Sequence, residues 1–139
     1  MYNPATVKKV IVNGTFDIVH RGHIEMLNYA RGLGDYLLVC IDSDRQVREF
    51  KGHTRPVNNQ YDRKFYLENL RCVDEVQIFD TQDELENICK QYEPDVMVKG
   101  SDYRGKKITG GQYCNEIKFY ELVANYSTSK IIENINNRK

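Results

Sequence analysis

The sequence predicts a single Rossmann-like α/β domain, residues 1–139, with a doubly wound sheet of five mostly parallel strands. Short apolar runs alternate with segments of helical periodicity along the whole chain, a pattern typical of right-handed crossovers between parallel strands. The length of 139 residues suits one domain with one sizeable core. No repeat, low-complexity tract or linker divides the chain.

The first three elements are predicted from residues 8–41. Residues 8–14, "KKVIVNG", are a short apolar run that predicts a strand. Residues 20–34 predict a helix that ends at Gly34, because apolar side chains recur at helical spacing (Ile24, Leu27, Ala30 and Leu33). Residues 35–41, "DYLLVCI", are almost continuously apolar, which is typical of a strand buried on both faces of a parallel sheet.

The middle of the chain predicts a loop, a helix, a strand and a second helix. Residues 42–59 are polar and charged and predict a loop, and residues 60–73 predict the helix that follows it. Residues 74–79, "DEVQIF", predict the third strand. Thr81 and Glu84 have the spacing of a capping box, and the helix that they begin has one apolar face (Leu85, Ile88, Cys89 and Tyr92).

The last part of the chain predicts two strands and a helix. Residues 94–100, "PDVMVKG", predict the fourth strand, and residues 116–123, "EIKFYELV", predict the fifth. Residues 127–137, "STSKIIENINN", predict a final helix with hydroxyl residues at its start. In the predicted order, the fourth and fifth strands follow each other and the final helix comes after both.

Charge and hydropathy exclude two classes of partner. Lys and Arg total 20 and Asp and Glu total 20, so the chain lacks the basic field that sequence-independent nucleic-acid binding requires. No apolar run approaches membrane-spanning length, and the first ten residues lack the apolar stretch of a signal peptide. We therefore expect a cytoplasmic protein without nucleic-acid or membrane partners.

The four cysteines predict packing rather than chemistry. Cys40, Cys72, Cys89 and Cys114 are far apart in the sequence and form no C-x-x-C pair. Such spacing is typical of reduced, mostly buried thiols in a cytosolic protein and does not indicate a disulfide or zinc framework.

Three polar loops are expected to meet at one edge of the sheet. Residues 13–17, 42–44 and 99–102 each follow a predicted strand. Because ligands of such sheets bind beyond the carboxyl ends of the strands, where the strand order reverses, these loops predict a ligand site at that edge.

Two of the three histidines lie at the same edge, at the start of the first predicted helix. His20 and His23 are three apart, so both rings can face one ligand, and Gly22 between them allows close approach. Helix N-terminal amides favour an anion, and imidazole donates hydrogen bonds to phosphate oxygens. A surface pair, a helix cap and a metal pair are the alternatives, but no third Cys or His ligand cluster supports a metal.

The stretch "GTFDIVHRGH", residues 14–23, resembles the HxGH signature of the nucleotidyltransferase superfamily, in its cytidylyltransferase-like branch. Four further segments match that family in order along the chain: "LGDYLLVCIDSD", "DRKFYLENLRCVDEV", "PDVMVKGSDY" and "STSKII". Class I aminoacyl-tRNA synthetases share the HxGH motif but are much larger. The resemblance therefore extends over nearly the whole chain.

The resemblance implies transfer of a nucleoside monophosphate from a nucleoside triphosphate to a small phosphorylated acceptor, with release of pyrophosphate. His20 and His23 would be catalytic donors to the triphosphate in its transition state, together with Lys51. Gly14, Thr15, Phe16 and Gly22 would line the nucleotide cleft, and Asp17 would order the loop or contact substrate and metal. Mg²⁺ is expected with the triphosphate, without a dedicated protein metal site.

Further residues are implied as ligands of the phosphates and of the nucleoside. Ser127, Thr128 and Ser129 would hold the β- and γ-phosphates at the start of the last helix. Lys99, Gly100 and Asp102 would contact the nucleotide. Arg55 and Arg63 would bind phosphate of the acceptor or of the leaving group, whereas His53 has no counterpart in the family and is expected to be exposed.

Two subfamilies differ in the nucleotide that they use. Glycerol-3-phosphate cytidylyltransferases read "RTxGxSTT" before the last helix, but this chain has Leu122 in the place of the arginine and Asn125 in the place of the glycine. "FKGHTRPVNN" and "PDVMVKGSDY" resemble heptose-1-phosphate adenylyltransferases, although Ser101 and Ser129 depart from their pattern. We therefore expect ATP and a sugar or polyol phosphate.

Two alternatives to this expectation stay open. CTP with glycerol-3-phosphate is the alternative within the same enzyme class. A catalytically silent nucleotide-binding module with the same fold is the alternative of another class. Family members are often dimers, so a homodimer with a contact around "RPVNN" is also expected.

Overall fold

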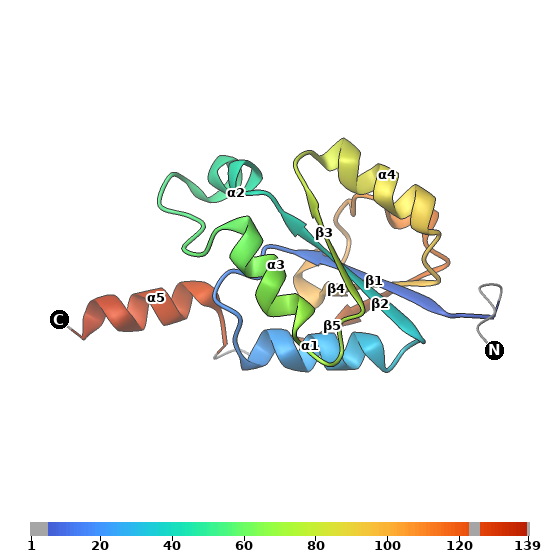
Figure 1. Ribbon diagram of the computed structural model, residues 1–139, viewed down its shortest axis with the longest axis horizontal. Coiled ribbons are helices and arrows are strands. Elements are labelled where there is room, and N and C mark those ends of the chain that lie inside the picture. The colour runs from blue at the N-terminus through green and yellow to red at the C-terminus, as the bar shows by residue number, and fades with distance from the viewer. Residues whose placement is uncertain (1–5, 123–125, 139) are drawn as a thin grey trace.

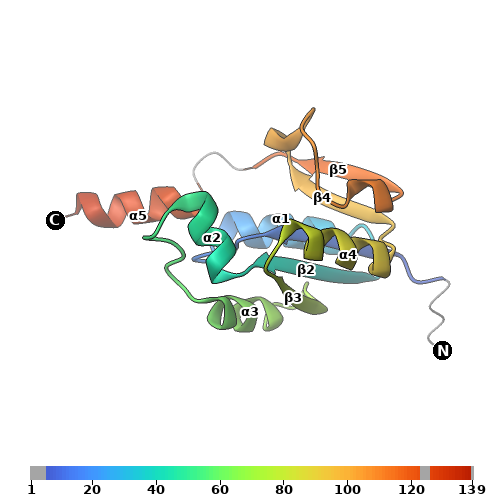
Figure 2. The same cartoon turned by 90° about the horizontal axis from the view of Figure 1, so that it is seen from above.

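The computed structural model describes residues 6–122 and 126–138 and has at its centre a five-stranded parallel sheet with the order β3-β2-β1-β4-β5. Figures 1 and 2 show the sheet from two directions. The single-domain, Rossmann-like α/β fold predicted from the sequence is confirmed, and every strand pair is parallel. The strands are β1 (Lys9–Gly14), β2 (Tyr36–Asp42), β3 (Glu75–Phe79), β4 (Val96–Gly100) and β5 (Glu116–Tyr120).

Helices cover both faces of this sheet. In Figure 1, α1 lies below the strands, α4 lies above them, and α5 projects from the body at one end. The helices are α1 (Arg21–Arg31), α2 (Asp44–Lys51), α3 (Gln60–Glu68), α4 (Gln82–Tyr92) and α5 (Thr128–Asn137), with short 3-10 turns η1 (Ser101–Tyr103) and η2 (Gly111–Tyr113). Among the described residues, none of the helices is long and apolar enough to cross a membrane.

The strands divide their side chains between two apolar layers. Val10 and Val12 of β1 pack in one layer with side chains of α1 and α3, whereas Ile11 packs in the other with side chains of α4. Leu37 to Ile41 alternate between the same two layers and are fully buried. The near-continuous apolar run of β2 therefore serves both faces, as its sequence predicts.

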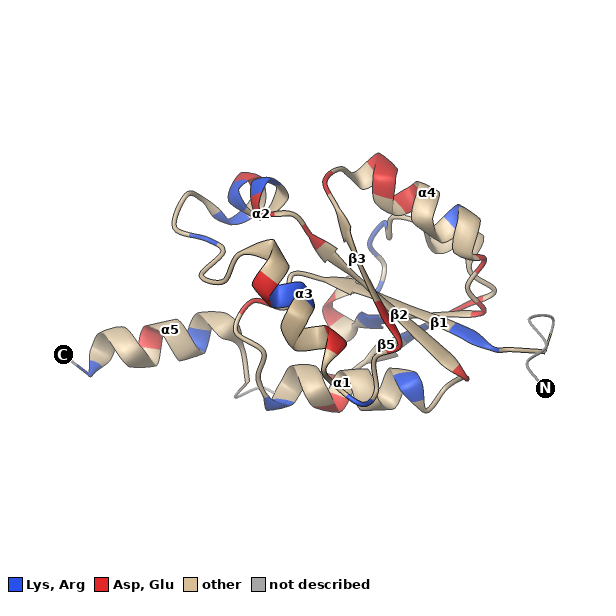
Figure 3. Ribbon diagram, in the orientation of Figure 1, with Lys and Arg blue, Asp and Glu red and all other residues tan. Residues whose placement is uncertain are grey.

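Charges are mixed over the helices. Figure 3 shows basic and acidic residues side by side on α2, and it shows acidic residues in the first turns of α4. Asp83 and Glu84 lie in the first turn of α4 and Lys90 in its last turn, which complements the helix dipole.

Cys40, Cys72 and Cys89 are buried and Cys114 is half-buried, as predicted.

The predicted loop at residues 42–59 is wrong in its first half, because it contains α2. Ser43 caps this helix by accepting a hydrogen bond from the backbone N–H of Gln46. Its eight residues include two apolar ones, Val47 and Phe50, and of these Val47 alone is buried, so the apolar signal for a helix is short. Lys51 is consequently the last residue of a helix, not part of a free loop.

Several predicted boundaries also differ from the structure. The cap of α1 is Gly32, and Gly34 instead lies where a Cβ atom would be 2.6 Å from the carbonyl oxygen of Lys8. The strand β5 ends at Tyr120, and residues 123–125 lie outside the described residues. The helix predicted over 60–73 ends at Glu68.

The capping box predicted for α4 is half correct. The hydroxyl of Thr81 accepts a hydrogen bond from the backbone N–H of Glu84 at 3.1 Å. The Glu84 carboxylate, however, accepts from the backbone N–H of Asp80, one residue before the cap.

Candidate active site

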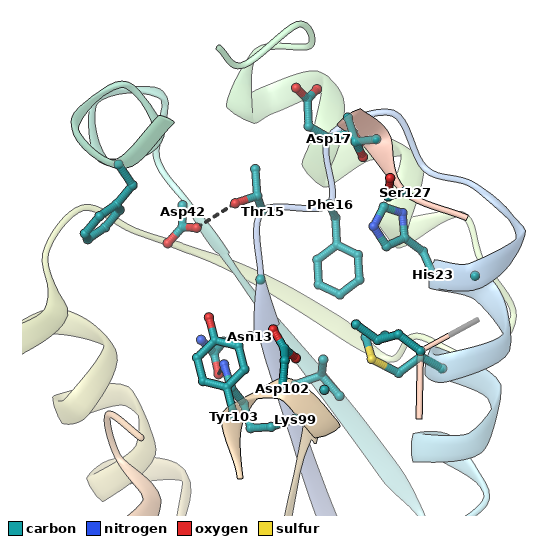
Figure 4. A pocket seen from close by; sticks show the side chains of 18 of the residues that line it. Asn13, Thr15, Phe16, Asp17, His23, Asp42, Lys99, Asp102, Tyr103 and Ser127 are labelled. Atoms are coloured by element: carbon teal, nitrogen blue, oxygen red, sulfur yellow. Dashed lines mark hydrogen bonds between the residues drawn. The ribbon is translucent and has the colours of Figure 1, made fainter. Parts of the chain in front are cut away.

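A cavity of about 580 Å³ opens beyond the carboxyl ends of β1, β2 and β4, at the edge that the sequence predicts (Figure 4). The three polar loops do meet there, since residues 13–17, Asp42 and residues 99–102 all contribute to or flank its wall. The sheet order reverses between β1 and β4, so the cavity lies at the topological switch point of the fold.

The structure brings most of the predicted site residues to this one cavity. Its lining includes His20, His23, Lys51, Gly14, Thr15, Phe16, Asp17, Gly22, Lys99, Gly100, Asp102, Ser127, Thr128 and Ser129. Arg55 and Arg63 are not among the described residues that line it. The placement of the first group agrees with the sequence analysis, and the chemical role of each residue stays a prediction.

The two histidines cap α1 reciprocally. His20 is the N-cap, and its Nδ1 accepts a hydrogen bond from the backbone N–H of His23 at 3.4 Å. In return, Nδ1 of His23 accepts from the backbone N–H of His20 at 3.3 Å. The rings stack with their centroids 3.7 Å apart, so both imidazoles face the cavity from one side of the helix start.

This cap determines which nitrogen of each ring can donate to a ligand. A neutral imidazole whose Nδ1 accepts a hydrogen bond carries its proton on Nε2. Burial lowers the pKa of both histidines, and for His23 burial, His20 and the Lys51 ammonium lower it to about 3. At neutral pH and without a ligand, both rings therefore present an uncharged Nε2–H donor.

Gly22 is required by close packing at the same helix start. A Cβ atom at this position would lie 2.9 Å from Cβ of Tyr126 and 3.0 Å from Cε1 of His20. Tyr126 stacks beside the His20 ring, with centroids 6.3 Å apart. Any larger residue would displace the tyrosine or the imidazole, so Gly22 maintains the geometry of the pair.

The loop after β1 holds Phe16 and Asp17 in fixed positions. Phe16 has a φ of 52°, which is unfavourable for a bulky residue, and its ring packs 5.0 Å from the His23 ring. The Asp17 carboxylate accepts backbone hydrogen bonds from Val57 at 2.7 Å and Asn58 at 2.9 Å. Of the roles considered for Asp17, ordering the loop is the one that the geometry provides.

Asp17 also connects this loop to α5. Its carbonyl oxygen accepts a hydrogen bond from the hydroxyl of Thr128. The hydroxyl of Ser127 accepts from the backbone N–H of Lys130 and caps α5, and the Ser129 hydroxyl accepts from Arg55 at 3.3 Å. The start of α5, which favours anions, is thereby fixed beside the histidine pair.

The phosphate-binding role predicted for Arg63 is wrong. Its side chain is fully buried, and its guanidinium donates to the carbonyl oxygens of Asn58, Thr15 and Asp42 at 2.8–2.9 Å. A fourth bond, at 2.8 Å, goes to the Asp44 carboxylate. Arg63 therefore joins the β1 loop, the end of β2 and the segment before α3, and it has no donor directed into the cavity.

Arg55 lies in a separate, polar pocket of about 270 Å³ between α2 and α3. His53 contributes to the same pocket and is exposed, as predicted. Hydrogen bonds from Arg55 to Ser129 and from the backbone N–H groups of Val57 and Asn58 to Asp17 link this pocket to the active-site cavity.

Several cavity residues were missed by the sequence analysis. Asp42 is the last residue of β2, and Asn13 is the last residue of β1 that has a side chain. Both segments were expected at the ligand edge of the sheet because they end strands, but neither residue was given a role. Tyr103, Tyr126, Gln82 and Thr109 follow no pattern in the sequence and are identified only by the fold.

Asp42 and Lys99 are two partly or fully buried charges in this cavity. The Thr15 hydroxyl donates to Oδ2 of Asp42 at 2.9 Å. Burial raises the pKa of Asp42, and the Thr15 hydrogen bond and nearby Arg63, Lys51 and Lys99 partly offset this effect. Lys99 is 8% exposed, and its ammonium lies 4.0 Å from the centroid of the Tyr103 ring.

The parallel sheet, the crevice beside β1 and the helix starts that face it together define the class of Rossmann-like α/β proteins. The chain belongs to the cytidylyltransferase-like family, whose model matches residues 11–134. This match includes the histidine pair, Lys51 and the start of α5.

Relatives in this family are bifunctional bacterial proteins. The chain is 48% identical over 126 residues to the bifunctional protein HldE of Campylobacter fetus and 43% identical over 132 residues to that of Helicobacter hepaticus. These matches cover 91% and 95% of this chain but only 27% of either relative. The chain thus spans about a quarter of the length of these relatives.

A solved structure supports the fold independently. The crystal structure of a lipopolysaccharide core biosynthesis protein from Thermoplasma volcanium superposes with a TM-score of 0.69 at 23% sequence identity. It covers 84% of this chain, and 99% of that protein is matched.

Proposed function

We propose that the protein transfers AMP from ATP to the phosphate group of a sugar or polyol phosphate and releases pyrophosphate. The observation that carries this proposal is the histidine pair, whose two Nδ1 atoms accept backbone N–H groups and which lines a cavity together with Lys51 and the start of α5. Family membership and the similarity to HldE support nucleotidyl transfer.

The reaction needs little covalent chemistry from the protein. An oxygen of the acceptor phosphate attacks the α-phosphorus of ATP, and the bond from that phosphorus to the bridging oxygen of the β-phosphate breaks. The electron pair of the broken bond leaves with pyrophosphate. Because a phosphomonoester has a second pKa of about 6, it is already mostly dianionic at neutral pH, and no general base is required.

The residues of the site act by positioning and by stabilising charge. The Nε2–H groups of His20 and His23 donate to oxygens of the reacting phosphates, where negative charge increases in the transition state. Lys51 contributes a positive charge from the end of α2. The first turn of α5 binds the β- and γ-phosphates through its backbone amides and hydroxyls.

Mg²⁺ is part of the proposal as the ion that accompanies ATP and neutralises phosphate charge. In residues 6–122 and 126–138, no group of three His, Cys, Asp or Glu side chains is arranged to hold a metal. Both Asp17 oxygens already accept backbone hydrogen bonds. We therefore expect Mg²⁺ to be held mainly by phosphate oxygens and water, with few ligands from the protein.

Leu122 supports ATP over CTP. It lines the cavity and takes the place of the arginine that cytidylyltransferases of this branch have before their last helix. A leucine donates no hydrogen bond to a cytosine. Asn125, the second departure from that pattern, lies outside the described residues.

The test is a comparison of kcat/KM for ATP and CTP, with heptose-1-phosphate and glycerol-3-phosphate as acceptors. We expect ATP with the sugar phosphate to be preferred by at least about tenfold. A preference for CTP with glycerol-3-phosphate would replace this proposal by the cytidylyltransferase alternative. The homodimer expected from the family is a further proposal, and sedimentation equilibrium tests it directly.

A further inference from the structure

The cavity has two halves with different linings, and the pleat of the sheet explains the division. Asn13, Asp42 and Lys99 alternate along their strands with residues of the α1 layer, so they point to the α4 face. Gln82 on α4, Tyr103 and Thr109 complete this polar half. Figure 4 shows Asn13, Lys99 and Tyr103 separated from His23 and Ser127, with Phe16 between the two groups.

The other half lies against α1 and is more apolar. Met26, Leu122 and Tyr126 line it beside the histidine pair. A flat, largely apolar nucleobase suits this lining, whereas a polyhydroxylated molecule suits the polar lining of the α4 half.

Asp42 limits what can bind in the α4 half. Its Oδ2 accepts from Thr15, while Oδ1 accepts no hydrogen bond from any residue that the structure describes. A carboxylate repels phosphate groups at short range, and both substrates carry several of them. Apart from the Mg²⁺ ion that accompanies ATP, the substrate atoms that fit next to Asp42 are hydrogen-bond donors, and on a phosphorylated sugar or polyol these are hydroxyl groups.

Lys99 provides the matching cation in the same half. Its ammonium has one hydrogen bond in the described part of the chain, to Oδ1 of Asn13 at a long 3.4 Å. Three donors on an ammonium leave capacity for a phosphate group. Burial of Lys99 reduces screening by water, so its interaction with an incoming phosphate is strong.

The direction of attack assigns the acceptor to this half. The attacking and leaving oxygens lie roughly in line on opposite sides of the phosphorus. If the start of α5 binds the leaving pyrophosphate, the acceptor phosphate approaches from the side away from α5. That side is the α4 half, where Lys99 and Asp42 lie.

We propose that Asp42 and Lys99 form the acceptor subsite, in which Lys99 binds the acceptor phosphate and Asp42 accepts hydrogen bonds from hydroxyls of the sugar or polyol. The inference rests on the proposed function. It adds that Asp42 selects acceptors that have hydroxyl groups near their phosphate. Asp42 is thus a specificity-determining residue.

The test compares Asp42→Asn with the wild-type protein and with Asp83→Asn, a control on the exposed surface of α4. Binding of mannose-1-phosphate in the presence of a non-hydrolysable ATP analogue is measured by calorimetry, alongside kcat/KM where turnover is observed. Loss of a charged hydrogen bond predicts acceptor binding about tenfold to a hundredfold weaker in Asp42→Asn. The affinity for the ATP analogue and the behaviour of Asp83→Asn should stay within about twofold of wild type.

Acceptor analogues test the same point without changing the protein. A series of mannose-1-phosphates that each lack one hydroxyl should include one analogue that wild type binds about tenfold more weakly than it binds mannose-1-phosphate. Asp42→Asn should bind this analogue and mannose-1-phosphate equally well. Lys99→Met should weaken binding of mannose-1-phosphate more than binding of the ATP analogue, which would assign Lys99 to the acceptor and not to the nucleotide that the family resemblance implies for it.

Two results would overturn the inference. One is equal acceptor affinity in Asp42→Asn and wild type. The other is that removal of a ribose hydroxyl, in 2′-deoxy-ATP or 3′-deoxy-ATP, weakens binding to wild type but not to Asp42→Asn, while removal of acceptor hydroxyls does not. That result would assign Asp42 to the ribose. Failure of the proposed function has a different signature, because wild type would then release no pyrophosphate from any triphosphate with any acceptor, whatever the binding data show.

Discussion

At the scale of single residues, the reciprocal cap of His20 and His23 links helix formation to chemistry. Each Nδ1 accepts a backbone N–H, so the fold selects the tautomer that donates from Nε2. The sequence predicted a phosphate site at this pair from its spacing and position. It did not show the exchange of hydrogen bonds, because that depends on backbone angles at His20.

Replacing either histidine by alanine should reduce turnover sharply. Each variant loses one preorganised donor, and comparable losses are about a hundredfold to a thousandfold in kcat. Steady-state pyrophosphate release measures the effect, with thermal melting to verify the fold. His53→Ala is the matched control, since His53 is exposed and lies outside the cavity. Turnover within about threefold of wild type would remove that histidine from the catalytic group.

The low pKa of His23 predicts how stability depends on pH. Its folded pKa of about 3 lies below the ordinary value of 6.5, so the folded state resists protonation. The contribution of His23 to the unfolding free energy is then fully present above pH 6.5. It decreases as the pH falls toward 3, by roughly 2 kcal/mol between pH 6.5 and pH 5. Urea unfolding at several pH values should show a smaller decrease in His23→Gln. Equal slopes in both proteins would contradict the assignment.

At the scale of elements, α2 is the part of the site that the sequence concealed. This helix is mostly polar, buries one apolar side chain, Val47, and is further held by the Ser43 cap and by the ion pair between Asp44 and Arg63. Lys51 at its end is exposed yet lines the cavity. A charged side chain at a helix end can approach bound triphosphate through small movements of one element.

Lys51→Ala should therefore lower kcat more than it weakens nucleotide binding. A charge that acts mainly on the transition state affects the chemical step, whereas uniform binding affects KM alone. Nucleotide affinity from calorimetry and kcat from pyrophosphate release separate the two cases. Arg48→Ala, on the same helix but outside the large cavity, serves as control. Equal losses in affinity and kcat would indicate uniform binding.

Arg63 should act on stability and only indirectly on catalysis. Removing it leaves three carbonyl oxygens and the Asp44 carboxylate without their buried partner. Arg63→Met is expected to lower the unfolding free energy by about 3–5 kcal/mol, the usual effect of breaking a buried charge network. Urea unfolding measures this. A loss below about 1 kcal/mol would show that the network contributes little.

At the scale of the whole molecule, the sequence predicted the sheet, its parallel strands and the edge that carries the site. These follow from apolar runs such as residues 37–41 and from polar residues directly after them, which are local signals. The fate of Arg63 was not predictable in the same way. Thr15, Asp42 and Asn58 are distant in sequence, and only the complete fold brings their carbonyl oxygens around one guanidinium.

The division of the cavity also belongs to the whole molecule. Asp42 and Lys99 lie on strands that are neighbours of β1 on opposite sides, and the pleat directs both side chains to the α4 face. The histidine pair lies on the α1 side. One sheet thus separates the groups proposed for the nucleotide from those proposed for the acceptor.

The most direct test of the proposed nucleotidyl transfer is pyrophosphate release from ATP by the wild-type protein, measured with and without a sugar phosphate and compared with His20→Ala. Nucleotidyl transfer by this site predicts pyrophosphate release that requires both substrates, exceeds the release with CTP, and falls at least about a hundredfold in the variant. Bound ATP without pyrophosphate release, with every triphosphate and phosphorylated acceptor offered, would contradict it and identify a silent nucleotide-binding module.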